Sequence, residues 1–337
     1  MKKIFIFLIG IIGLVACENQ DVDFDDFEYT SGYFPYQFPV RTLVLGDYIY
    51  DNTNDNNHKF VISVAMGGVY NNTKSREFGF VIDKSLCDNI LFGTDGDVIK
   101  VLPDNYYTLS SDEKIVIPSG ELSGGIEVQL TDEFFNDPLA IKLGYVLPVR
   151  LTGSADVDTI MSGKASIPNA DPRLVSQWEE APMDFVMFAI KYINEYHGTY
   201  LHYGESKVKD ATSNVIENKV YSKNNLVDNS TSDLVTIGRN KVSLSTFLHS
   251  DIMTGEIKMV LDFNEKNCTI TAAEGSSFTI TGTGVFKSNA YEWGNKERNG
   301  IELTYQVSDG VNTYEANDVL VIRNRGVVFE TYTPVTF

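Results

Sequence analysis

The sequence predicts an all-β protein: an N-terminal immunoglobulin-like β-sandwich, followed by a C-terminal antiparallel β-barrel of the lipocalin type or by a second sandwich. Short runs rich in β-branched and aromatic residues alternate with turn residues along the chain, and 12% of the residues are aromatic. No sustained helical periodicity separates these runs, so the crossover helices of a parallel sheet are not expected. At 337 residues the chain is long enough for two domains that each bury a core.

The charge balance narrows the class of partner. The chain carries 46 acidic against 27 basic side chains, a formal net charge of -19. Such a surface repels phosphate backbones and anionic lipid headgroups, so we expect no nucleic-acid ligand and no polybasic membrane contact. Neutral or cationic partners fit this balance better.

Residues 1–16 have the order of a signal peptide, because Lys2 and Lys3 precede an apolar run that is too short to span a membrane as a helix. The sequence Leu-Val-Ala-Cys at 14–17 resembles the bacterial lipobox, which implies that Cys17 is lipidated and begins the mature chain. Residues 17–31 are predicted to form an acidic tether. An acidic stretch after the lipidated cysteine resembles the surface-export signal of Bacteroidetes lipoproteins, and a plain solvated spacer is the alternative. The expected location is the outer membrane, lipid-anchored and facing the cell exterior.

Residues 32–167 are predicted to form the β-sandwich. Strand-length runs occur at 41–45, 59–66, 78–82, 114–118, 125–131 and 145–151, and turn residues such as Gly67-Gly68 and Asn71-Asn72 separate them. Because no helical segment intervenes, the runs favour two packed antiparallel sheets.

Residues 168–197 are predicted to be the junction between the domains. Two prolines mark a surface connection at its start, and residues 184–196 form an unbroken apolar and aromatic stretch. Periodicity alone does not separate a buried strand from a short helix here. We take this stretch as the last strand of the first domain, leading into the second.

Residues 198–337 are predicted to form the second domain. The runs lie at 197–204, 218–222, 234–237, 242–247, 256–263, 268–272, 277–286, 301–307 and 313–322. Short turn-like connections join them, and Asp309-Gly310 is a strong hairpin signal. Consecutive hairpins favour an up-and-down sheet closed into a barrel. Cys87 and Cys268 fall in different predicted domains, so we expect two small buried side chains and no disulfide between them.

Several ordered segments resemble one known family. The segments at 33–46, 67–72, 102–109 and 128–132, followed by the block at 188–200, are similar to a Bacteroidetes outer-membrane lipoprotein family. Its members carry an adhesin-like N-terminal domain of unknown function and are associated with Sus-type polysaccharide-utilisation loci. The resemblance implies a surface lipoprotein that binds carbohydrate beside Sus-type transport components. It carries over no catalytic residue, because the remaining 140 or so residues are too few for a barrel hydrolase of about 250 residues.

Two segments have the composition of a sugar-binding surface, where aromatic faces stack on sugar rings and polar groups bind hydroxyls. Tyr291 and Trp293 lie among polar and charged residues at 288–299, which we expect to be an exposed loop; the alternative is a loop aromatic that caps the barrel. Tyr200 and His202 share one face of a predicted strand, and one face of that strand must be core.

The sequence carries no signature of an enzyme or of a metal enzyme. His197 and His202 lie on opposite faces of one predicted strand, and no zinc, nucleophile-elbow or phosphate-loop motif occurs. Asp51, Asp55 and Asn57 alternate like calcium ligands, but the glycine and glutamate of an EF-hand loop are missing, so a solvated loop is the favoured interpretation.

The sequence-based hypothesis is therefore a monomeric, non-enzymatic lipoprotein that binds polysaccharide or oligosaccharide as an accessory to glycan uptake. The alternatives are a structural or adhesive spacer within an outer-membrane complex, and a barrel that encloses a small apolar ligand.

Overall fold

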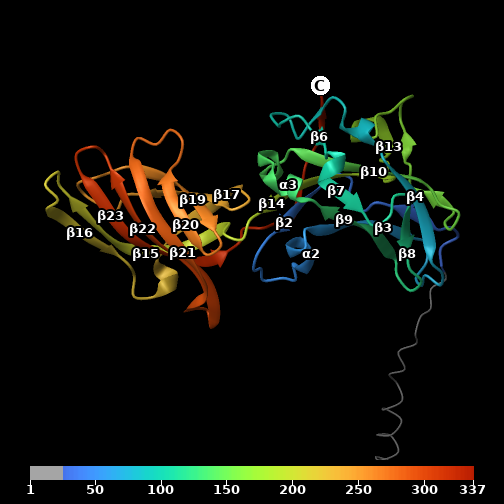
Figure 1. The fold of residues 1–337 in the computed structure, drawn as a ribbon. Coiled ribbons are helices and arrows are strands. Elements are labelled where there is room, and N and C mark those ends of the chain that lie inside the picture. The colour runs from blue at the N-terminus through green and yellow to red at the C-terminus, as the bar shows by residue number, and fades with distance from the viewer. Residues whose placement is uncertain (1–25) are drawn as a thin grey trace, which may run out of the picture.

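The computed structural model describes residues 26–337, so the predicted signal peptide, Cys17 and most of the tether lie outside the described residues. Two β-sheet bodies lie side by side, and the chain passes from one to the other and back (Figure 1). The all-β prediction is confirmed, with a sandwich first and a barrel second. Over residues 26–337, no helix is long and apolar enough to cross a membrane.

The first body is a sandwich of two sheets around one apolar core. One sheet has the strand order β11 (Thr159–Ile160), β1 (Ser31–Tyr33), β3 (Lys59–Gly67), β9 (Ser123–Leu130) and β7 (Tyr107–Leu109). The other has the order β24 (Glu330–Thr331), β2 (Pro39–Val44), β14 (Phe185–Ile193), β10 (Tyr145–Gly153), β4 (Arg76–Ile82) and β8 (Lys114–Ile117), and β6 (Lys100–Val101) also pairs with β10. Strand β3 shows why the sequence pattern was readable: Phe60, Ile62 and Val64 are buried in the core while Val61 between them is exposed.

Strand β14 is buried on both faces, which explains why its sequence does not alternate. Val186 and Ile190 face the sandwich core, whereas Phe185, Met187 and Ala189 belong to a second apolar cluster on the other side of the sheet. The prediction that this stretch is a strand of the first domain is confirmed by its pairing with β10 and β2.

The second body is a closed barrel of consecutive antiparallel strands. These are β15 (Gly198–Lys209), β17 (Ser230–Gly238), β18 (Lys241–Phe247), β19 (Glu256–Asn264), β20 (Asn267–Ala272), β21 (Thr279–Trp293), β22 (Lys296–Ser308) and β23 (Thr313–Asn324). Strand β23 pairs with β15 along its whole length and closes the barrel. Strand β16 (Val215–Tyr221) pairs with the second half of β15 and lies at an edge.

Segment 288–299, which we expected to be a loop, is part of a long hairpin instead. Strands β21 and β22 continue past a bulge, pair Tyr291 with Arg298 and Trp293 with Lys296, and project from the barrel (Figure 1). The turn between them is Gly294-Asn295, and both residues have positive φ angles of 62° and 57°. Two such residues form the tight turn that matches the twist of a hairpin, so the strands do not need to separate into a loop.

The barrel interior is filled with side chains. Large residues such as Tyr200, Met259 and Tyr314 are 0–1% exposed to a water-sized probe, and Tyr196 stacks on Phe263 at 3.6 Å between ring centroids. Side chains that lined a sizeable void would remain accessible to such a probe. The packed interior therefore disfavours the hypothesis of an enclosed apolar ligand.

The C-terminal segment returns to the first body, where its end lies beside β6 in Figure 1. Strand β24 pairs with β2, and β25 (Val335–Thr336) pairs with β5 (Ile90–Leu91). Tyr332 packs against Phe38 and Phe92. The last residues thus join the sandwich rather than the second domain, where the sequence placed them, because strands of two residues leave no periodic signal.

The remaining elements are short. The helices are α2 (Thr53–Asn56) and α3 (Asp132–Asn136), with 3-10 turns at Lys84–Cys87, Asp104–Tyr106, Pro138–Ile141, Val175–Gln177 and Leu226–Asp228. Strand β12 (Lys164–Ala165) pairs with β13 (Trp178–Glu180) in the connection before β14. Cys87 and Cys268 are both free and buried, one in each body, as expected.

Candidate functional site

One arginine joins the two bodies. Arg325, at the end of β23, donates to the backbone carbonyls of Leu45 at 2.9 Å, Asp47 at 2.7 Å and Asn194 at 2.6 Å. Its side chain is buried, and charge-assisted hydrogen bonds of this kind are about twice as strong as neutral ones. Arg325 therefore fixes the loop after β2 against the base of the barrel.

A second set of contacts supports the junction. The Asn194 side chain donates to the carbonyls of Gly238 and Lys241, both at 3.0 Å, and His197 Nδ1 accepts from the Thr236 N–H at 3.1 Å. Burial, with the nearby Arg325 charge, lowers the pKa of His197 to about 4. At neutral pH His197 is thus an uncharged acceptor in the junction.

An apolar hollow of about 590 Å³ opens beside this junction on the sandwich. Tyr36, Tyr48, Tyr50 and Phe329 all line it. Tyr36 and Phe329 lie 5.3 Å apart and are 57% and 70% exposed, and Tyr48 and Tyr50 lie 5.5 Å apart in an edge-to-face pair. The sandwich thus displays four aromatic side chains in one place.

A second hollow of about 750 Å³ lies between the same loop and the β21–β22 hairpin. Both hollows are lined by Tyr48, Tyr50, Val327 and Val328, so they meet. We call the two together the junction groove. The second hollow is lined by polar and charged residues from both bodies, among them Asp47, Glu195, Lys296, Arg298, Asn299 and Arg323.

The predicted site residues Trp293 and Tyr291 lie on the hairpin behind this second hollow. Trp293 is half-buried, its indole Nε1 donates to the Ile322 carbonyl at 3.1 Å, and the Arg298 guanidinium lies 4.2 Å from its ring centroid. Tyr291 donates to Glu302 at 2.8 Å, and burial together with this hydrogen bond raises its pKa. Both aromatics thus support a wall of the groove, and Arg298 is the neighbour that lines it.

The other predicted pair, Tyr200 and His202, lies inside the barrel. Tyr200 donates to the Tyr196 carbonyl at 2.8 Å and is 1% exposed. His202 Nδ1 lies 2.8 Å from the Ser232 hydroxyl, and Asp318 accepts hydrogen bonds from Tyr305 and Tyr221 beside it. The face that the sequence left undecided is therefore the core face, and this pair offers no exposed platform.

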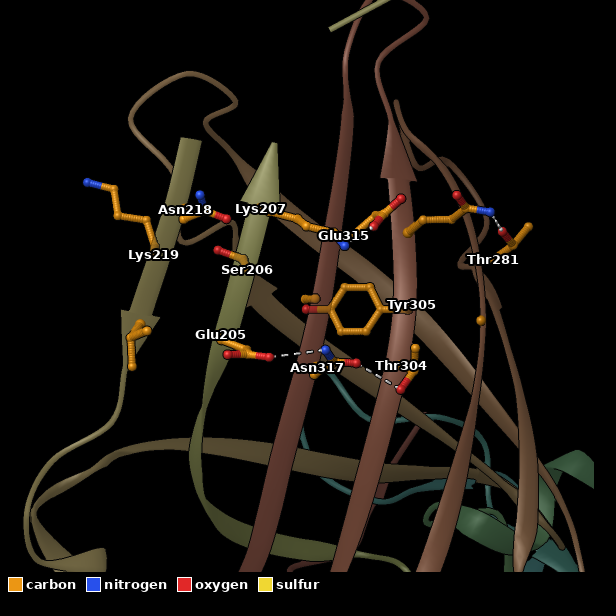
Figure 2. A pocket seen from close by; sticks show the side chains of 14 residues that line it. Glu205, Ser206, Lys207, Asn218, Lys219, Thr281, Thr304, Tyr305, Glu315 and Asn317 are labelled. Atoms are coloured by element: carbon orange, nitrogen blue, oxygen red, sulfur yellow. Dashed lines mark hydrogen bonds and ion pairs between the residues drawn. The ribbon is translucent and has the colours of Figure 1, made fainter. Parts of the chain in front are cut away.

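A separate polar hollow of about 470 Å³ lies on the outer face of strands β15, β16, β21, β22 and β23. Figure 2 shows its central row, in which Thr304 donates to Asn317 at 3.0 Å and Asn317 donates to Glu205 at 3.4 Å. Lys207 pairs with Glu315 at 3.0 Å in the next row. Its polar groups thus bind one another, and its one aromatic, Tyr305, is buried, so this surface lacks a stacking platform.

The predicted calcium-like loop adopts a different arrangement. Residues 53–56 form helix α2, and Asp55 is buried, where its carboxylate binds Arg41 and accepts from the Val44 N–H at 2.8 Å. Asp51 accepts from the Thr53 N–H at 3.0 Å. Across residues 26–337, no group of three or more His, Cys, Asp or Glu side chains is arranged to hold a metal ion.

Sequence reasoning missed the aromatic half of the groove. Tyr48 and Tyr50 follow Gly46 in an irregular segment, and Tyr36 lies in another, so an alternating tyrosine pair in a loop was the available signal. Phe329 carried no such signal, because it reaches the groove only when the tail returns to the sandwich.

Two family models match the chain in separate halves. Residues 195–326 match a domain of unknown function, DUF5627, and residues 27–158 match a model described as an N-terminal domain. No curated protein matches the chain.

Solved structures from Bacteroides ovatus resemble this fold. A protein of unknown function is 32% identical with a TM-score of 0.85, over 92% of this chain and 100% of that one. A multidomain protein that includes DUF1735 is 12% identical with a TM-score of 0.42, over 89% of this chain and 97% of that one. A candidate carbohydrate binding protein is 11% identical with a TM-score of 0.28, over the same shares, 89% and 97%.

Proposed function

The chain belongs to the same family as the Bacteroides ovatus protein of unknown function, and from that premise we propose that it is a non-enzymatic glycan-binding protein that uses the junction groove. The observation that carries the proposal is the display of Tyr36, Tyr48, Tyr50 and Phe329 along one continuous groove. Sugar rings present flat apolar faces to such side chains, and their hydroxyls require polar partners close by.

The polar requirement is met in the adjoining half of the groove. Asn299 donates to Asp47 at 2.9 Å, so an amide and a carboxylate lie within reach of a ring held at Tyr48 or Tyr50. Isolated exposed aromatics are common on protein surfaces, but a contiguous exposed patch marks a binding site. A groove that draws one wall from each body also suits an extended oligosaccharide better than a single sugar.

We place this protein at the outer membrane, anchored through lipidated Cys17 and facing the cell exterior, with Sus-type transport components as its partners. The lipobox-like residues and the acidic tether support this location. A Cys17→Ala variant is expected to leave the membrane fraction and to lose labelling by a fatty-acid analogue. Retention in the membrane fraction without labelling would contradict the anchor.

The binding proposal is tested by affinity gel electrophoresis of the purified protein against plant, host and microbial polysaccharides. We expect one polysaccharide to retard the protein and Tyr50→Ala to abolish the retardation. Tyr70→Ala is the matched control, because Tyr70 is 60% exposed against 69% for Tyr50 but lies outside the groove. No retardation by any polysaccharide, or equal loss in both variants, would contradict the proposal.

The same experiment tests the absence of catalysis. A glycosidase needs two carboxyl groups about 5 to 10 Å apart across the scissile bond. If the protein only binds, prolonged incubation with the retarding polysaccharide releases no reducing ends. Released ends that disappear in a Glu195→Gln or Asp47→Asn variant would make the groove an active site instead.

The spacer hypothesis has one feature in its favour. Strand β16 lies at an edge of its sheet, and Val215, Ile216 and Val220 on it are exposed. Exposed edge strands pair readily with another chain. Cross-linking from a cysteine placed at Val220 would capture a protein partner if this edge is an interface.

A further inference from the structure

The cations of the junction groove stand out in this acidic chain. Most of the described lysines and arginines form ion pairs with carboxylates. Among residues 26–337, those without one are Arg76, Lys100, Lys223, Lys266, Lys296, Arg298, Arg323 and Arg325. The last four all line the second hollow of the groove.

Arg325 already serves the junction through its three carbonyl partners, but the other three side chains do not. Lys296 and Arg323 are exposed, and Arg298 is half-buried with a buried Nε that has no hydrogen-bond partner. A buried, unsatisfied donor is costly, so a ligand that accepts from it gains affinity.

Arg298 is also held in a defined orientation. Its guanidinium lies 4.2 Å from the centroid of the Trp293 ring, and the indole is fixed in turn by its bond to the Ile322 carbonyl. A guanidinium stacked in this way presents its N–H groups as a rigid fork, which matches the geometry of a carboxylate or sulfate.

The local charge differs from that of the whole molecule. The same hollow contains the carboxylates of Asp47, Glu195 and Glu297, so its cations outnumber its anions in a chain whose net charge is -19. The surrounding acidic surface repels anions at longer range, and only a ligand seated in the groove meets these cations closely.

We infer that the groove binds acidic glycans, in which sugar rings stack on the tyrosines and a carboxylate or sulfate group binds Arg298 and Arg323. This inference rests on the proposed glycan-binding function and names its substrate class. The aromatic hollow and the cationic hollow meet at Tyr48 and Tyr50, so one oligosaccharide chain can contact both.

The test compares matched pairs of acidic and neutral polymers by isothermal titration with the purified protein. Polygalacturonate is paired with its full methyl ester, and dextran sulfate is paired with dextran. We expect at least one acidic polymer to bind about tenfold or more tightly than its neutral partner. The first pair reports carboxylate recognition and the second reports sulfate recognition.

The variants separate this inference from the proposed function. Arg298→Gln and Arg323→Gln should each weaken binding of the acidic polymer about tenfold, whereas Lys266→Gln, an exposed lysine without an ion pair outside the groove, should not. Equal binding of acidic and neutral polymers that Tyr50→Ala still abolishes would overturn the inference and leave the proposed function standing. Binding of no polymer of either kind would overturn both, and equal effects of all three charge variants would overturn the inference.

Discussion

His202 Nε2 lies 2.9 Å from Asp318 Oδ2 inside the barrel, where the two side chains are 1% and 0% exposed. The contact has ion-pair distance without the geometry of a linear hydrogen bond, since Nε2 has no hydrogen-bond partner. Asp318 also accepts from Tyr305 at 2.8 Å and from Tyr221, whose ring stacks on His249 at 3.8 Å. Burial and the Asp318 charge raise the pKa of Tyr221 and of Tyr305, so both hydroxyls stay protonated and donate.

We therefore expect Asp318→Ala to destabilise the barrel by about 3–5 kcal/mol, because removing one partner leaves buried polar groups uncompensated. The measurement is the free energy of unfolding in urea. Asp262→Ala is the matched control, since Asp262 pairs with Lys241 on the barrel surface at 2.7 Å and should contribute less than about 1 kcal/mol. Similar losses in the two variants would show that the buried network adds nothing special.

The junction histidine predicts a pH dependence of stability. His197 has a pKa of about 4 in the folded chain against an ordinary value of 6.5, so between these values the unfolded chain binds more protons. Stability is therefore lost as pH falls from about 6.5 towards 4, by up to about 3 kcal/mol from this group. His197→Gln, which keeps an acceptor for the Thr236 N–H, should lose part of this dependence. Unfolding curves at pH 7.5 and pH 5 that change equally in both proteins would contradict this assignment.

Most of the strands could be predicted, because each keeps one face in a core. The alternation of Phe60, Ile62 and Val64 in β3 is readable in this way, and the turn chemistry of Asp309-Gly310 placed the β22–β23 hairpin correctly. The aromatic groove could not be predicted, since its members come from segments far apart in sequence that only the returning tail brings together.

The pairing of Tyr200 with His202 on one face was predicted, but not the face itself. Both possible faces of that strand carried one polar and one apolar residue, so composition could not choose between them. The choice depended on Asp318 and Ser232, which lie on other strands and give His202 its buried partners. Long-range polar satisfaction of this kind leaves no local sequence signal.

Arg325 predicts that stability and ligand binding are coupled at the junction. Arg325→Met removes the donors to the carbonyls of Leu45, Asp47 and Asn194, which should cost about 3 kcal/mol or more. It should also weaken glycan binding, since the loop that carries Tyr48 and Tyr50 loses its anchor. Urea unfolding and limited proteolysis of the junction measure the first effect. Arg323→Met is the control for stability, because Arg323 is exposed and should leave the unfolding curve unchanged.

Trp293 distinguishes direct sugar stacking from the positioning of a cation. If Trp293 acts by orienting Arg298, Trp293→Ala should weaken binding of the acidic polymer about fivefold to tenfold and leave binding of its neutral partner unchanged. Trp293→Phe keeps a ring beneath Arg298 but loses the bond from Nε1 to the Ile322 carbonyl, so its effect should be smaller. If the indole itself stacks on sugar, both polymers lose affinity equally in Trp293→Ala, because a sugar face carries no charge. Isothermal titration of the two polymers against the two variants measures this difference, and unchanged affinity throughout would remove Trp293 from the binding surface.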